Sequence, residues 1–262
     1  MDLEVRGAQA YAASGHKPID SEKQTVVFVH GVGQDHTTWV LPIRYFARHN
    51  RNVLGLDLPG HGRTPGPGLE TIEEMGDWVV EALDAAGVEK AALVGHSMGS
   101  LVALETASRY PERVRSLAMV GVSIPLAVSD ALMTSAEVGS HDAIDMLTYW
   151  SHSKAAQVGG SPTPGMWMVG GGMRLWEQAA PGVIHSDLRA CNEYAVGLNR
   201  AGEIQCPALL ILGEKDVMTP VRAAQAVKEA IPDQDTVIFR GAGHALLAER
   251  SDPVLDQLIR IV

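Results

Sequence analysis

The sequence predicts an α/β protein with a doubly wound, mostly parallel sheet, and three observations support this prediction. Short apolar runs alternate with helical stretches along most of the 262 residues. The apolar runs are continuous rather than alternating, as in strands that are buried on both faces. Hydrophobic residues make up 46% and charged residues 20% of the chain, which fits one large globular core and excludes disordered and fibrous classes.

The elements follow one another in a regular order. Residues 3–13 alternate loosely around Gly7, which predicts a hairpin at the edge of the sheet. Buried strands are then expected at 26–29, 52–56, 91–94, 116–122, 207–212 and 236–239. Helix-forming residues at suitable spacing predict helices over 39–48, 71–86, 98–109, 221–230 and 252–259. Thr219 followed by Pro220 indicates the N-cap of the helix at 221–230.

One long segment interrupts this order. No clear strand is found between the runs at 116–122 and 207–212, and a loop-like stretch rich in glycine and proline occupies 159–165. The segment also carries many methionine and tryptophan residues. We therefore expect a helical cap at 125–203, inserted into a core that consists of 1–124 and 204–262.

Charge and composition exclude several classes of partner. Lys and Arg number 21 against 31 Asp and Glu, for a net charge of −10, and no basic run is present, so a nucleic-acid partner is not expected. The apolar runs are too short to span a membrane, and the acidic N-terminus does not resemble a secretion signal. We expect a cytoplasmic protein in which Cys191 and Cys206 are reduced. The sequence makes no prediction of the oligomeric state.

Residues 95–99 carry the chemistry. They read Gly-His-Ser-Met-Gly between a predicted strand and a predicted helix, which is the pattern of a nucleophile elbow. A turn this sharp tolerates only very small neighbours and lifts the serine hydroxyl out at the carboxyl edge of the sheet. The free N–H groups of the following helix point to the same place. Ser97 is therefore the candidate nucleophile.

A serine nucleophile needs a histidine base that is oriented by an acid, and on such an elbow the acid and then the histidine follow in the chain. His244 lies in Gly-Ala-Gly-His just after the run at 236–239. Asp216 lies in the loop after the run at 207–212, where Glu214 is a competing carboxylate. We predict Ser97, Asp216 and His244 as the catalytic triad because Asp216 is further beyond the strand.

Acyl transfer also needs donors for the oxyanion. The predicted donors are the backbone N–H groups of Met98, which follows the nucleophile, and of Val32, which is flanked by two glycines in the loop after the first buried strand. His30, Asp35 and His36 could form a metal cluster. No metal or cofactor is predicted, because no accompanying His or carboxylate motif appears elsewhere.

Taken together, these motifs resemble those of the α/β-hydrolase superfamily, in the order of that family. In chain order they are His-Gly-Val-Gly at 30–33 with Trp39 downstream, Asp-Leu-Pro-Gly-His-Gly at 57–62, the elbow at 95–99, Gly-Glu-Lys-Asp at 213–216 and Gly-Ala-Gly-His at 241–244. The resemblance implies the α/β-hydrolase fold, with the cap where the insertion falls. It also implies a structural turn at 57–62, with no catalytic role for Asp57 or His61.

The candidate triad and the resemblance predict a cofactor-independent serine hydrolase that cleaves carboxylic esters or lactones through an acyl-enzyme. An enol-lactonase or a cofactor-free haloperoxidase or perhydrolase would use the same triad. A hydrolase-like receptor with little turnover is the alternative from another class. We expect a small ester or lactone substrate with an apolar acyl part, bound by Trp150, Met168 and Trp176. Alternatively, these three residues only pack the cap onto the core.

Overall fold

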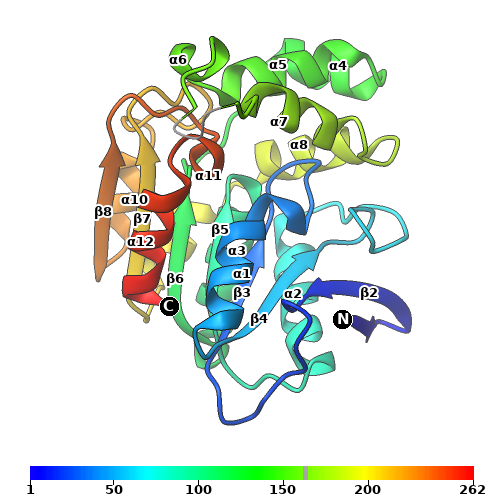
Figure 1. Cartoon of the computed structure of the whole chain (residues 1–262), viewed down its shortest axis with the longest axis vertical. Helices are drawn as coiled ribbons and strands as arrows, with labels where there is room; N and C mark the ends of the chain where they lie inside the picture. Colours follow the sequence, from blue (N-terminus) through cyan, green and yellow to red (C-terminus); the bar gives the residue numbers. More distant parts are fainter. Residues whose placement is uncertain (162–164) are drawn as a thin grey trace.

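The computed structural model, which describes residues 1–161 and 165–262, contains one eight-stranded sheet between two layers of helices (Figure 1). The strand order is β1-β2-β4-β3-β5-β6-β7-β8. This architecture confirms the predicted fold class. The strands are β1 (Asp2–Val5), β2 (Ala8–Ala13), β3 (Thr25–Val29), β4 (Asn52–Asp57), β5 (Ala91–His96), β6 (Val114–Val120), β7 (Ala208–Gly213) and β8 (Gln234–Phe239).

Only the N-terminal edge of the sheet is antiparallel. β2 pairs antiparallel with both β1 and β4, and every later pairing is parallel. Arg6 and Gly7 connect β1 and β2 with φ of 55° and 73°. Positive φ at both central residues is the geometry of the tight hairpin turns that match the twist of a sheet. The predicted edge hairpin is therefore present.

The central strands are buried on both faces, as their continuous apolar runs predict. Every residue of β3, β5 and β7 is buried. One apolar cluster joins the sheet to α2 (Ile72–Ala85), α3 (Met98–Arg109) and α10 (Gln225–Ala230), and a second joins the other face to α1 (Val40–Arg48) and α12 (Ser251–Ile261). Short helical turns η1 (His36–Trp39), η2 (Pro111–Arg113) and α11 (Leu246–Glu249) complete the core.

The helix expected at 221–230 begins four residues later than predicted. α10 starts at Gln225, and Thr219 caps no helix. Instead, the Thr219 hydroxyl donates a hydrogen bond to Oδ2 of Asp216 at 2.6 Å. A threonine that caps a helix accepts from a backbone N–H, whereas this hydroxyl lies against a carboxylate and donates to it.

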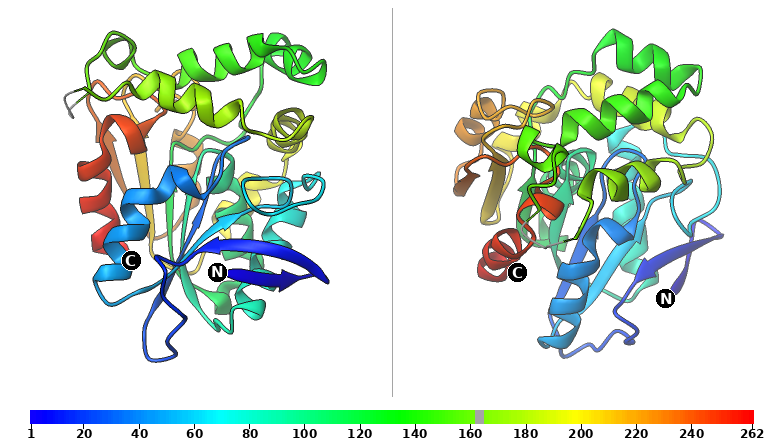
Figure 2. Two further views of the ribbon diagram at one scale, coloured as in Figure 1. Left: turned by 45° about the vertical axis from the view of Figure 1, so that its right-hand side comes forward. Right: turned by 45° about the horizontal axis from the view of Figure 1, so that its top comes forward.

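Helices fill the described residues between β6 and β7. They are α4 (Asp130–Glu137), α5 (His141–Ser151), α6 (Lys154–Gln157), α7 (Met168–Trp176), α8 (Val183–Glu193) and α9 (Gly197–Gly202). Figures 1 and 2 show α4 to α8 over the edge where the parallel strands end. We call α4 to α8 the overlying helices. Of the predicted loop at 159–165, residues 162–164 lie outside the described residues. None of the described helices is long and apolar enough to cross a bilayer.

Candidate active site

Ser97 occupies the strained turn between β5 and α3. Its φ of 55° and ψ of −119° lie in a region that residues with a side chain rarely adopt. The neighbouring glycines are required by space, because a Cβ atom on Gly95 would lie 2.0 Å from the Gly99 carbonyl oxygen. A Cβ atom on Gly99 would lie 2.2 Å from the carbonyl oxygen of Val29. The chain therefore holds the Ser97 side chain outward, at the edge beneath the overlying helices.

Asp216 and His244 come together from the loops after β7 and β8. Nδ1 of His244 lies 2.7 Å from Oδ2 of Asp216, and both side chains are buried. Asp216 also accepts hydrogen bonds from the backbone N–H groups of Met218 and Thr219, both at 2.8 Å. Burial alone would raise the pKa of Asp216, but His244 and the Thr219 donors lower it to about 2. The carboxylate is thus charged and fixes the His244 ring with Nδ1 protonated.

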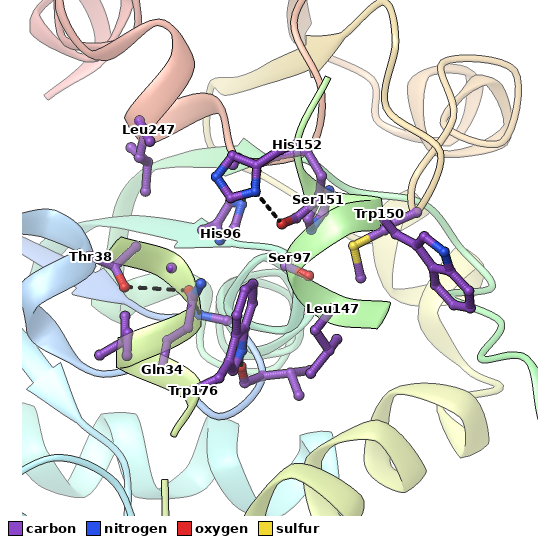
Figure 3. Close-up of a pocket in the computed structure, with 18 of the residues that line it drawn as sticks. Gln34, Thr38, His96, Ser97, Leu147, Trp150, Ser151, His152, Trp176 and Leu247 are labelled. Carbon is purple, nitrogen blue, oxygen red and sulfur yellow. Dashed lines mark hydrogen bonds between the residues drawn. The ribbon is translucent and has the colours of Figure 1, made fainter. Parts of the chain in front are cut away.

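Ser97 lies in the same pocket as this pair. Ser97 and His244 both line one cavity of about 560 Å³, and Figure 3 shows the Ser97 side chain among the residues that surround it. With Nδ1 donating to Asp216, Nε2 of His244 carries a lone pair. Nε2 is buried and has no hydrogen-bond partner among the described residues. The structure therefore pairs Asp216 with His244 and places Ser97 in their pocket, without a hydrogen bond between the Ser97 hydroxyl and Nε2.

The competing carboxylate lies elsewhere. Oε2 of Glu214 accepts a hydrogen bond from the backbone N–H of Gly241 at 2.8 Å, in an exposed position. This contact and the nearby Lys215 lower the pKa of Glu214. Glu214 therefore ties two loops together, and Asp216 is the carboxylate that contacts His244.

The loop at 30–33 leaves one donor free. The Gly31 carbonyl accepts from Nδ1 of His30 at 2.9 Å and from the Gln34 N–H at 3.2 Å. The next peptide unit is also engaged, because the Val32 carbonyl and the Gly33 N–H each have a side-chain partner. The Val32 N–H has none among the described residues. A Cβ atom on Gly31 would lie 3.2 Å from Cβ of Ser97, so this loop borders the serine.

The second predicted donor is at the start of α3. Met98 is the first residue of this helix, and Ser97 makes no side-chain cap. The Met98 N–H therefore lacks a partner among the described residues, as the first N–H groups of helices generally do. Both predicted oxyanion donors are thus unpaired among the described residues: Met98 follows Ser97 in the chain, and Val32 lines the same pocket as Ser97.

The pocket is mostly apolar. Trp150, Met168 and Trp176, the three residues predicted to bind substrate, all line it. Trp150 is partly exposed, whereas Met168 and Trp176 are buried. Trp176 also donates its indole N–H to the Val32 carbonyl at 2.8 Å, a contact that no sequence pattern indicates. Further apolar residues complete the lining, among them Leu126, Leu132, Leu147, Leu175, Val217 and Met218.

Two histidines of the pocket were not singled out by sequence analysis. His96 donates from Nε2 to the carbonyl of His244 at 3.1 Å, and burial with the nearby His244 lowers its pKa to about 3. His152, at the end of α5, directs Nδ1 to the carbonyl of Thr148 at 2.8 Å. A carbonyl only accepts, so this contact requires the proton on Nδ1. Nδ1 also lies 3.1 Å from Oγ of Ser151 (Figure 3). Nε2 of His152 is therefore an acceptor, and it has no partner among the described residues.

His96 could have been predicted to lie in the pocket because it directly precedes the candidate nucleophile. No sequence spacing predicts that His152 lies there. Burial lowers the pKa of His152, which favours this neutral form. The end of α5 thus adds a hydrogen-bond acceptor, Nε2 of His152, to a mostly apolar lining that also includes Nε2 of His244.

The possible metal ligands group differently from the sequence-based alternative. Atoms of Asp35, His36 and Asp57 lie within 4.8 Å of one another, and His30 is not among them. Asp57 already accepts from the backbone N–H groups of His36 at 2.7 Å and Arg63 at 2.9 Å. Nε2 of His30 accepts from the N–H of Leu58 at 3.2 Å. These residues hold the loop and the 57–62 turn together.

Comparisons with known proteins agree with this fold. A family model described as the alpha/beta hydrolase fold matches residues 24–251. An (E)-2-((N-methylformamido)methylene)succinate hydrolase of Acinetobacter baylyi is 28% identical over 209 residues, covering 78% of this chain and 76% of that protein. The putative carbamate hydrolase RutD of Escherichia coli is 27% identical over 240 residues, covering 87% of both. The crystal structure of the enol-lactonase from Burkholderia xenovorans LB400 has a similar fold, with a TM-score of 0.86, 19% identity and 99% and 98% coverage of the two chains.

Proposed function

The chain belongs to the α/β-hydrolase fold family, and from that premise we propose that it is a cofactor-independent serine hydrolase of carboxylic esters or lactones. The observation that carries the proposal is the placement of His244. Its Nδ1 is bonded to Asp216 at 2.7 Å, and its free Nε2 lies in the pocket of Ser97. A histidine held in this tautomer can take a proton from a serine hydroxyl.

The proposed reaction has two halves. Oγ of Ser97 attacks the substrate carbonyl carbon while its proton passes to Nε2 of His244. The N–H groups of Val32 and Met98 donate to the oxyanion of the tetrahedral intermediate. The intermediate collapses as Nε2 gives the proton to the leaving alcohol, which leaves an acyl group on Ser97. Water then attacks the acyl carbonyl with His244 as base, which releases the acid and restores the serine.

The lining of the pocket supports the proposed class of substrate. Its apolar lining favours an acyl group of hydrocarbon character. Nε2 of His152 is an acceptor, so a substrate with an N–H or O–H group on its bound part would satisfy it. We therefore expect esters or lactones that combine an apolar chain with one hydrogen-bond donor.

The acceptor on His152 also favours a second candidate, carbamate hydrolysis by the same steps. A carbamate carries an N–H group beside the carbonyl carbon that Ser97 would attack. The similarity to the putative carbamate hydrolase RutD supports this candidate. Carbamate hydrolysis and ester hydrolysis would use the same residues, so an assay separates them only by which substrate is cleaved faster.

The test uses chromogenic esters of increasing acyl length, simple lactones and an N-alkyl carbamate with the same leaving group. Ser97→Ala should lower kcat by about 10⁴- to 10⁶-fold. Ser100→Ala is the matched control, because its hydroxyl is already bonded to the carbonyls of Gly95 and Val120 and should affect stability rather than turnover. Wild-type turnover in Ser97→Ala would contradict the proposal. Saturable binding without turnover in the wild type would indicate a receptor.

A further inference from the structure

The peptide unit between Val32 and Gly33 is held at both ends by side chains that are far away in the sequence. Nε1 of Trp176, on α7, donates to the Val32 carbonyl at 2.8 Å. The Gly33 N–H donates to Oδ2 of Asp187, on α8, at 2.8 Å. Both side chains are buried. Two of the overlying helices thus contact the same peptide unit from opposite ends.

The acceptor on α8 is itself held by the 57–62 turn. Oδ2 of Asp187 also lies 2.9 Å from Nε2 of His61, while Nδ1 of His61 lies 3.0 Å from the carbonyl of Pro59. Both ring nitrogens of His61 therefore face oxygen atoms, those of Asp187 and of Pro59. Burial would lower the pKa of His61, but Asp187 raises it overall. The 57–62 turn thereby supplies a buried partner that holds Oδ2 of Asp187 in place.

Close packing reinforces these two hydrogen bonds. Gly33 has a φ of 61°, and a Cβ atom there would lie 2.7 Å from Cγ1 of Ile184 on α8. The same atom would lie 3.2 Å from Cδ1 of Trp176. The helices press directly on the backbone of the loop, so the peptide unit cannot rotate without moving them.

The held unit is joined to the proposed oxyanion donor through one Cα atom, that of Val32. The preceding unit, which carries the Val32 N–H, is fixed at its carbonyl end by His30 and Gln34. The Val32 N–H can therefore turn only if the peptide unit between Val32 and Gly33 turns with it. We infer that Trp176 and Asp187 are positioning residues, through which α7 and α8 hold the Val32 N–H toward the oxyanion. The inference rests on the proposed function.

The first test is Trp176→Phe, which removes the indole N–H and keeps an aromatic ring in the pocket. If the Val32 N–H no longer points at the oxyanion, kcat should fall by about 10- to 100-fold, with KM within about threefold of the wild type. Trp78→Phe is the matched control, since Trp78 is a buried tryptophan of α2 that does not line the pocket. It should keep the wild-type kcat.

Two inhibitors separate this effect from a change in binding. Oγ of Ser97 adds to the carbonyl carbon of a trifluoromethyl ketone, and the alkoxide that forms needs the oxyanion donors. The carbonyl carbon of the methyl ketone of equal chain length is not attacked and stays trigonal. In Trp176→Phe the inhibition constant of the first should rise by about the same factor as kcat falls, and that of the second should not change. An unchanged ratio of the two constants would overturn the inference.

Asp187 gives a second, independent readout. Asp187→Asn retains an acceptor for the Gly33 N–H and should keep more activity than Asp187→Ala. Hydrogen exchange at the Gly33 amide should be faster in Asp187→Ala than in the wild type, and equal rates would overturn the inference. Failure of the proposed function is seen separately, as turnover that survives Ser97→Ala. Even in that case, the hydrogen-exchange rate at the Gly33 amide would test whether α7 and α8 hold the loop.

Discussion

Gly121 lies directly behind the His244 ring, and Gly121→Ala should impair the enzyme through that contact. Gly121 follows β6 with a φ of 64°. A Cβ atom there would lie 2.9 Å from Cε1 and 3.0 Å from Nδ1 of His244. Ordinary carbon contacts begin near about 3.5 Å, so the ring must shift by about 0.5 Å. Asp216 holds Nδ1 at 2.7 Å, so the shift strains that bond or turns Nε2 away from Ser97.

Two costs add up in this variant. A left-handed alanine costs about 1–2 kcal/mol, and overpacking adds about 1–3 kcal/mol. Misplacement of the base by a fraction of an ångström should lower kcat by about 10- to 100-fold. Denaturant unfolding and ester hydrolysis under saturating substrate measure the two effects.

Gly139→Ala is the matched control. Gly139 has a φ of 66°, and a Cβ atom there would meet nothing within 4 Å. This variant carries the left-handed cost alone, so it should lose about 1–2 kcal/mol of stability and keep the wild-type kcat. If Gly121→Ala matched Gly139→Ala in both stability and kcat, the His244 ring would not lie where the structure places it, and the reasoning would be refuted.

Three further predictions follow from buried carboxylates. Asp216→Asn should lower kcat by about 10⁴-fold by disturbing the His244 tautomer, whereas Glu214→Gln should stay near wild type in the ester assay; the reverse order would reassign the acid. The pKa of Asp216 is about 2 in the folded protein, against 3.8 for an unperturbed carboxyl group. Its contribution to the free energy of unfolding is therefore fully present above about pH 4 and falls by about 2 kcal/mol as the pH drops through 2. Unfolding curves at pH 5 and pH 2.5 should show the stabilities of the wild type and Asp216→Asn converging, and an equal difference at both pH values would disprove the prediction. Tyr194→Phe should cost about 1.5–3 kcal/mol without changing kcat, because the Tyr194 hydroxyl donates to buried Glu105 at 2.6 Å; equal denaturation midpoints would contradict this.

The local features of the site were predictable from the sequence. The glycines around Ser97, the strand before it and the helix after it lie within a few residues, and their spacing alone requires a sharp turn. The same holds for the loop at 30–33 and for the positions of Asp216 and His244 after their strands. Parallel strands end at one edge of a sheet, so residues that follow different strands come together there. The order of the strands therefore indicated which loops would meet.

Thr219 shows where local rules fail. Its position before Pro220 fits a helix cap, but its hydroxyl donates to Asp216 instead. The sequence also left Glu214 as a competing acid, and only the direction of the loop separates the two carboxylates. One faces the His244 ring and the other the Gly241 N–H. The two carboxylates are two positions apart in an irregular loop, and such a loop has no periodic pattern from which the direction of each side chain could be predicted.

The sequence by itself determined the fold, the order of the motifs and the candidate nucleophile and base, because each depends on short-range spacing or on the regular arrangement of parallel strands, and it narrowed the acid to Asp216 or Glu214. Only the tertiary structure decided which side chains of the overlying helices reach the site. Asp187 meets Gly33 across 154 positions and Trp176 meets Val32 across 144. Contacts of that range depend on how the helices pack over the sheet, and neither helix carries a local pattern that encodes its partner.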